Sequence, residues 1–165
     1  ISSCSMLTVT TIRTLFKNVV TSYVEGISWA SDWNKALDHD PTIAYPACLW
    51  KPPFTGCVKV GSTDADVFGL DVLLLDDTAD DRTPEQRDEA YEKMEAIARI
   101  CYRQFCKKYV KSTGLHEGQE IDLKVQNPPV FTAMWDQAGT MTTGVRMVVS
   151  FRNESPVPCL DALFN

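Results

Sequence analysis

Two histidines are the residues of this sequence best suited by type to proton transfer at neutral pH. His39 lies in the segment Asp38-His39-Asp40-Pro41, which is typical of a turn, and His116 also falls in an expected loop. The sequence contains no G-x-S-x-G nucleophile motif and no G-x-x-x-x-G-K or G-x-G-x-x-G phosphate loop. We therefore predict no catalytic residues and no enzymatic activity, with a hydrolase that uses His39 or the aspartates as an alternative.

A cluster of aspartates follows the most apolar segment of the chain and could bind calcium, since carboxylate oxygens are ligands that Ca²⁺ prefers. The cluster lacks the residue order of an EF-hand loop and the glutamate that closes it. Acidic residues just before a helix also stabilise the helix through its dipole. We therefore expect a solvated loop, and no metal or other cofactor, at Asp76, Asp77, Asp80 and Asp81.

Six cysteines are spread along the chain, at positions 4, 48, 57, 101, 106 and 159. None has C-x-x-C spacing, and two histidines are too few for a typical zinc site. Cys101 and Cys106 are five residues apart on a predicted helix, so their side chains project about 140° apart and do not pair. The spacing favours small buried hydrophobic residues in a reducing compartment, while a disulfide such as Cys48–Cys57 stays open.

Two helices and several strands must position these residues. The longer helix, predicted over residues 83–111, opens with Thr83 as its cap, Pro84 at the first helical position and Gln86 completing a capping box. A nearly continuous apolar run, Val67–Leu75, predicts a strand that is buried on both faces. We expect an α+β fold, with a mixed, largely antiparallel sheet covered by two amphipathic helices. The other expected elements are a helix over 8–25, strands over 45–50, 56–60, 121–126, 130–136 and 142–152, and an irregular connection over 27–44.

Length and composition indicate one globular domain. A chain of 165 residues is long enough for one self-sufficient core, which we place in residues 1–152, followed by an extended C-terminal arm over residues 153–165. The formal net charge of −6 argues against a basic nucleic-acid binder, because such proteins neutralise phosphates with lysine and arginine. The longest apolar run is far too short to cross a bilayer, so we expect no membrane association.

Scattered tryptophans and an apolar chain end suggest contacts with other molecules. Tryptophans can stack on sugars or bases, but in a domain of this size they more often lie in the core or at subunit contacts. The arm ends in apolar residues that dock either on its own domain or on a neighbour. The residues predicted to make subunit or partner contacts are Trp33, Trp50, Pro52, Pro53, Leu160, Leu163 and Phe164.

The order of these elements, together with two sequence segments, resembles the tail-terminator and tail-completion proteins of bacteriophages. The segments are Tyr-Pro-Ala-Cys-Leu-Trp-Lys-Pro-Pro-Phe at 45–54 and Gly-Val-Arg-Met-Val-Val-Ser-Phe at 144–151, and the resemblance spans about residues 10–152. It implies a mixed sheet with packed helices in a virion protein that is assembled in the host cytoplasm. It also implies a ring, commonly of six subunits, that caps the tail tube at the head–tail junction.

The resemblance implies partners as well as a fold. These are copies of the chain itself, most often in a hexamer, together with tail-tube and neck or connector proteins. DNA would pass through the lumen without specific binding, and the acidic charge balance is compatible with that. Two alternatives stay open, which are a neck or connector adaptor of the same virion region and, from another class, a small ligand-binding or effector domain.

Overall fold

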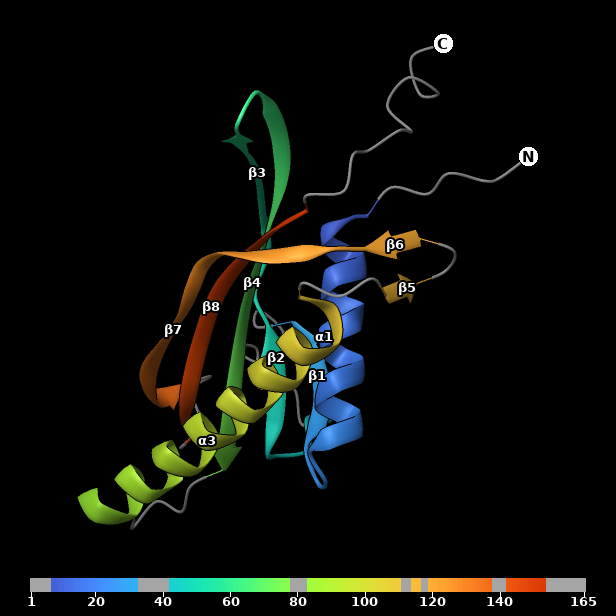
Figure 1. Cartoon of the computed structure of the whole chain (residues 1–165). Helices are drawn as coiled ribbons and strands as arrows, with labels where there is room; N and C mark the ends of the chain where they lie inside the picture. Colours follow the sequence, from blue (N-terminus) through green and yellow to red (C-terminus); the bar gives the residue numbers. More distant parts are fainter. Residues whose placement is uncertain are drawn as a thin grey trace.

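The computed structural model describes residues 7–32, 42–77, 83–110, 114–116, 119–137 and 142–153. Two helices lie on one face of a six-stranded mixed sheet, and a separate sheet has two short strands (Figure 1). This architecture confirms the predicted α+β class. In chain order the elements are α1 (Val9–Tyr23), β1 (Ser28–Asp32), β2 (Ala47–Trp50), β3 (Phe54–Val60), β4 (Thr63–Asp77), α3 (Pro84–Tyr109), β5 (Gly114–His116), β6 (Gln119–Ile121), β7 (Leu123–Gln137) and β8 (Thr142–Asn153).

The large sheet is arranged around its longest strand pair. Its strand order is β1-β2-β4-β8-β7, and β3 also pairs with β4. β1 and β2 run parallel, while every other pair in this sheet is antiparallel. β4 and β8 pair from Asp66 opposite Asn153 to Asp77 opposite Thr142. β2 and β3 therefore lie end to end along the other side of β4, separated by a bend at residues 51–53.

β4 is buried on both faces, as its apolar run predicted. Val72 and Leu74 join the main core beneath the helices. Leu73 and Leu75, which point the other way, join a smaller cluster on the opposite face together with Leu49 of β2. Successive side chains of a strand alternate between the two faces of the sheet, so a run whose one charged residue is Asp71 needs cover on each side.

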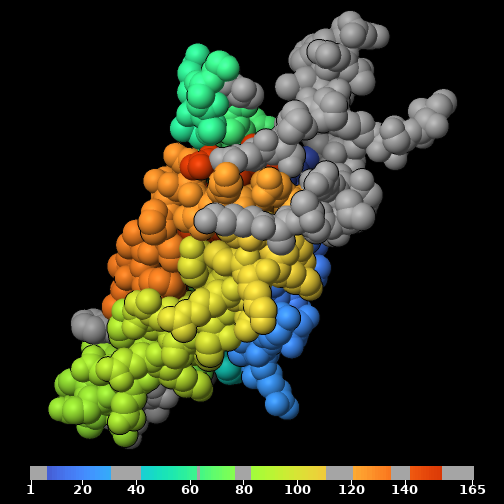
Figure 2. Space-filling model, viewed as in Figure 1, coloured from blue at the N-terminus to red at the C-terminus, as the bar shows by residue number. Residues whose placement is uncertain are grey.

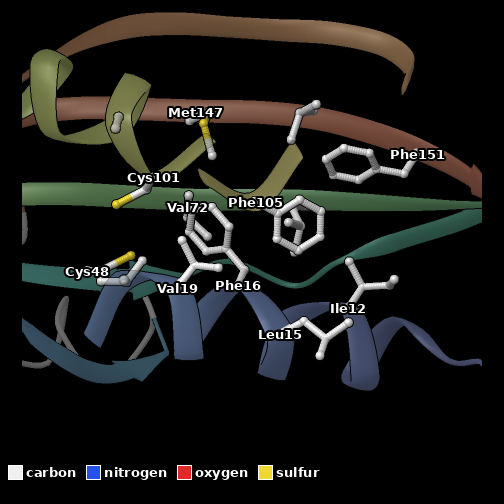
Figure 3. Packing of buried hydrophobic residues seen from close by; sticks show 14 of the residues in the cluster. Ile12, Leu15, Phe16, Val19, Cys48, Val72, Cys101, Phe105, Met147 and Phe151 are labelled. Atoms are coloured by element: carbon white, nitrogen blue, oxygen red, sulfur yellow. The ribbon is translucent and has the colours of Figure 1, made fainter. Parts of the chain in front are cut away.

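The main core fills the space between the two helices and the sheet (Figure 3). Apolar residues of α1 recur at helical spacing and are buried, from Ile12 to Val20. The ring centroid of Phe105 on α3 lies 6.0 Å from that of Phe16 on α1 and 5.0 Å from that of Phe151 on β8. This aromatic cluster ties α1, α3 and β8 together, and burial of its apolar surface holds the helices on the sheet.

α3 begins where the sequence predicted. The Thr83 hydroxyl accepts a hydrogen bond from the Gln86 backbone N–H, and the Gln86 side chain accepts one from the Thr83 N–H. Pro84 occupies the first turn, where a missing N–H costs nothing. The buried side of the helix consists of Ala90, Met94, Ala98, Cys101, Phe105 and Tyr109.

The predicted irregular connection over residues 27–44 contains a strand. Ser28–Asp32 forms β1, parallel to β2, and the Ser28 N–H donates to the Pro46 carbonyl at 3.0 Å. Its sequence has little intrinsic strand preference, so pairing with β2 determines its conformation. β2 is therefore an inner strand, although prolines beside a strand are typical of a sheet edge.

The prediction of two strands separated by Asn127-Pro128-Pro129 is also wrong, because β7 continues through these residues. Its pairing with β8 shifts register between Val125 and Asn127, and again between Asn127 and Val130. β7 lies at the edge of the sheet, where a proline faces only one neighbouring strand and an irregular register can absorb it.

One ion pair lies on the sheet face opposite the helices. Asp71 of β4 is buried, and its carboxylate oxygens accept hydrogen bonds from Nε and Nη2 of Arg146 on β8, at 2.9 and 2.6 Å. These bonds raise the pKa of Arg146 above its ordinary value. A buried carboxylate needs such a partner, so the pair satisfies Asp71 and also links β4 to β8 through side chains.

Gly144 provides a stability test of the β4–β8 contact. A Cβ at this position would lie 1.9 Å from the carbonyl oxygen of Leu74, which belongs to the backbone and cannot rotate away. We expect Gly144→Ala to lower the free energy of unfolding by about 2–3 kcal/mol, as overpacking of a tight site does. Urea unfolding followed by circular dichroism measures this change.

The matched control is Gly56→Ala, where a Cβ meets nothing within 4 Å. It should change the free energy of unfolding by less than about 1 kcal/mol. Equal stability of Gly144→Ala and the parent chain would contradict the close approach of β8 to β4.

Candidate assembly interface

The residues considered for catalysis or metal binding do not come together in the described part of the chain. Asp76 forms an ion pair with Lys93 of α3, with 3.3 Å between Oδ2 and Nζ. Within the described ranges, no group of three or more His, Cys, Asp and Glu side chains is placed to hold a metal ion. Outside the described part lie His39, Asp80, Asp81 and the side chains of Asp77 and His116.

The buried cysteines are core residues. Cys48 of β2 and Cys101 of α3 lie close together in the helix–sheet core with free thiols (Figure 3). Burial raises the pKa of both thiols, that of Cys101 to about 12, and the nearby Cys101 raises the pKa of Cys48 further. Such thiols stay protonated at neutral pH and are poor nucleophiles. Cys57 is also free, so the disulfide Cys48–Cys57 is absent.

A two-stranded segment projects from the rest of the large sheet, and we call it the β3–β4 ribbon (Phe54–Val60 paired with Thr63–Gly69). Gly61 lies in its turn with a φ of 65°, a left-handed conformation that glycine adopts without strain. β8 ends opposite Asp66, so the tip of the ribbon extends past the rest of the sheet (Figure 1). Among the described residues, the tip of the ribbon therefore pairs with no strand outside the ribbon itself.

The ribbon exposes apolar side chains. Every residue of β3 is exposed except the half-buried Val58, and the exposed ones include Phe54 at 44% and Val60 at 38%. The Phe54 ring lies over Gly69, whose missing side chain leaves room for it. Two-stranded ribbons are marginally stable in water, so a partner that covers these side chains would stabilise this one.

The large sheet also has open backbone edges. Among the described residues β3 pairs with β4 alone, and β7 pairs with β8 apart from a single bridge between Val110 and Leu123. β7 contains Pro128 and Pro129, which lack the N–H groups that an added strand would use, whereas β3 contains no proline. Of these two strands, β3 is therefore the better edge for pairing with a strand of another molecule.

Three of the seven predicted contact residues lie at the base of the ribbon. Pro52, which is exposed, and Pro53, which is half-buried, lie in the bend between β2 and β3. Trp50 packs against the main core, and its ring centroid lies 4.1 Å from the guanidinium carbon of Arg13, so part of its surface is already used within the subunit. The other four, Trp33, Leu160, Leu163 and Phe164, lie outside the described residues.

The sequence-based prediction omitted the apolar residues of the ribbon. Phe54 and Val60 were not among the expected contacts, although Gly61-Ser62 between two apolar segments is typical of a hairpin. That signal could have located the turn. It could not have shown that the hairpin projects past β8, because this depends on where two strands distant in sequence end.

No described helix is both long and apolar enough to span a bilayer. Comparison of the chain with protein-family models gave no matching family, and comparison with curated proteins gave no matching relative. The function must therefore be inferred from the surfaces described above.

The burial of the core thiols predicts their reactivity. In the folded protein at about pH 8, iodoacetamide should alkylate Cys57 and leave Cys48 and Cys101 unmodified, because the buried thiols are protonated and inaccessible. Peptide mapping by mass spectrometry measures each site. Labelling in urea is the control in which all three react, and rapid alkylation of Cys101 in the folded protein would contradict its place in the core.

Proposed function

We propose that this protein is a structural protein of a bacteriophage virion, a ring-forming tail terminator or tail-completion protein at the head–tail junction. The resemblance of residues 45–54 and 144–151 suggests the class. The observation that carries the proposal is the β3–β4 ribbon, which presents exposed apolar side chains and, among the described residues, an open strand edge. A protein of this design acts by fitting against copies of itself and transforms no molecule.

The placement of the ribbon suits a contact that closes into a ring. Rings form from head-to-tail contacts, in which two different surfaces of the subunit meet. The ribbon lies on the β2 side of β4, and β7 lies at the opposite edge of the sheet. A subunit can therefore bind one neighbour through its ribbon and a second neighbour through the side of the sheet that carries β7. The number of six subunits comes from the resemblance alone.

The negative net charge of the chain is consistent with a ring that surrounds DNA without binding its phosphates. A formal net charge of −6 repels phosphates, whereas specific binding requires clustered lysine and arginine. We place the ring in the virion, after assembly in the host cytoplasm, with tail-tube and neck or connector proteins as its further partners.

The direct test is a mass measurement in solution combined with negative-stain imaging of the purified chain. A closed ring with a central hole is the expected result. A monomer that holds a small ligand among its aromatic side chains would instead indicate a ligand-binding domain.

Substitution of the exposed apolar residues tests the ribbon. Phe54→Ser combined with Val60→Ser should weaken ring formation at least about tenfold, because apolar contact residues supply much of the affinity at an interface. The fold should be retained, since neither side chain belongs to a buried core cluster and each is more than a third exposed. Light scattering after size-exclusion chromatography measures the mass, and circular dichroism measures the fold.

The matched control is Tyr23→Ser at the end of α1, far from the ribbon and 51% exposed (Figure 1). It should leave the ring unchanged. Rings that persist undiminished in the ribbon double variant would exclude a subunit contact through the ribbon.

Truncation after Asn153 tests the C-terminal arm. The shortened chain keeps every described element and should stay folded. It loses Leu160, Leu163 and Phe164. If the arm packs on a neighbouring subunit, rings of the shortened chain should dissociate at a higher protein concentration than rings of the full-length chain. Analytical ultracentrifugation measures the equilibrium, and an unchanged oligomer would refute the role of the arm.

A further inference from the structure

The side of α3 that faces away from the sheet is exposed along its length (Figure 2). Its exposed positions recur every three or four residues, and at 3.6 residues per turn they align within about 100° on one side of the helix, opposite the buried residues. We call this surface the α3 stripe. It consists of Glu85, Glu89, Glu92, Ala96, Ile100, Arg103 and Lys107.

The α3 stripe changes sign along the helix. Its acidic residues all lie before Ala96, and its basic residues all lie after Ile100. Lys93, a cation in the acidic half, turns toward β4, where its Nζ lies 3.3 Å from Asp76 Oδ2. The acidic half of the stripe is therefore not interrupted.

The helix dipole accounts for only part of this pattern. It favours acidic residues in the first turn and basic residues in the last, and its effect fades within that turn. Glu89 and Glu92 lie beyond the first turn, and Arg103 lies before the last. Ile100, which is 47% exposed near the middle of the helix, gains nothing from the dipole. The dipole therefore leaves the inner charges of the stripe and the exposure of Ile100 unexplained.

The α3 stripe is complementary to itself when it is reversed. Glu85 and Lys107 each lie eleven positions from Ala96, and Glu89 and Arg103 each lie seven positions from it. Two stripes laid antiparallel with their Ala96 residues in contact therefore place each of these acidic residues opposite a basic one. The small side chain at the crossing point lets the two helices approach closely. Glu92 and Ile100 each lie four positions from Ala96, so each Ile100 lies opposite Glu92 of the other helix.

We propose that the α3 stripe binds the same stripe of a second copy of this chain, antiparallel, about a two-fold axis at Ala96. A two-fold contact makes each interaction twice, so the dimer contains two Glu85–Lys107 pairs and two Glu89–Arg103 pairs. The inference involves no residue of the β3–β4 ribbon and does not rest on the proposed phage function.

Exchange of charge tests this pairing. Variant A carries Glu85→Lys and Glu89→Lys, and variant B carries Arg103→Glu and Lys107→Glu. Each variant alone brings like charges together at all four pairs, so its dimer dissociation constant should rise at least about tenfold above that of the parent chain. An equimolar mixture of A and B restores opposite charges at all four pairs and should dimerise as the parent does.

Sedimentation equilibrium measures the dimer, in chains that also carry Phe54→Ser and Val60→Ser so that the ribbon does not contribute. Circular dichroism checks that each variant is folded. Lys17→Glu, on the exposed side of α1, is the matched charge-reversal control and should leave the dissociation constant unchanged. Added salt should weaken the parent dimer, because exposed charge pairs are screened.

A parent chain that stays monomeric at every concentration would overturn the proposal, as would a mixture of A and B that dimerises no better than either variant alone. Ile100→Ser is a second test with the charges intact and should weaken the dimer severalfold; an unchanged constant would contradict the stated alignment. Because the dimer is measured in the ribbon double variant, failure of ring formation and failure of the α3 contact are observed separately.

Discussion

The antiparallel pairing of β4 with β8 is the interaction on which the rest of the structure depends. It aligns Val72 and Leu74 with β8 residues on the helix side, so α1 and α3 have one continuous apolar surface to cover. On the opposite face it brings Asp71 within hydrogen-bond reach of Arg146. Gly144 permits the two strands to approach as closely as they do. The same pairing fixes the base of the ribbon, because β4 continues past the last residue of β8.

The parts of the fold that follow from local physical chemistry could be predicted from the sequence. The start of α3 is determined by Thr83, Pro84 and Gln86, which satisfy the first turn by themselves. The burial of β4 on both faces follows from the run Val67–Leu75, since apolar residues fall on both faces and the one charge, Asp71, is paired with Arg146. These elements need no distant partner to be identified.

The parts that depend on distant partners could not be predicted. β1 has the sequence Ser-Trp-Ala-Ser-Asp, which favours no regular structure, and it forms because β2 offers a free edge. Local sequence preference predicts that a strand ends at Pro128 and Pro129. β7 nevertheless continues through them, because it lies at the edge of the sheet and its register with β8 shifts there. In both cases tertiary pairing outweighs the preference of the residues themselves.

The candidate interface also combines what local sequence determines with what distant strand pairing determines. Trp50 and Phe54 are both aromatic and lie only four positions apart in the sequence. Trp50 ends an inner strand and packs on the core beside Arg13, whereas Phe54 begins the ribbon and remains 44% exposed. Residue type therefore indicates that a side chain can make a contact. The topology of the sheet decides whether that side chain packs within its own chain or stays exposed to solvent.

The β3–β4 ribbon and the α3 stripe would bind partners through different interactions. This difference determines under which conditions both contacts can form. A ribbon contact depends on apolar burial and backbone hydrogen bonds, which respond little to ionic strength, whereas the stripe depends on exposed ion pairs that salt screens. A head-to-tail contact through the ribbon extends until a ring closes, while a two-fold contact through the stripe is complete with two copies. If both contacts form, with the two-fold axis perpendicular to the axis of the ring, the assembly is two rings joined face to face. Exposed ion pairs contribute only about 0.2–1 kcal/mol each. The two-fold contact would therefore dissociate when another surface competes for binding to α3.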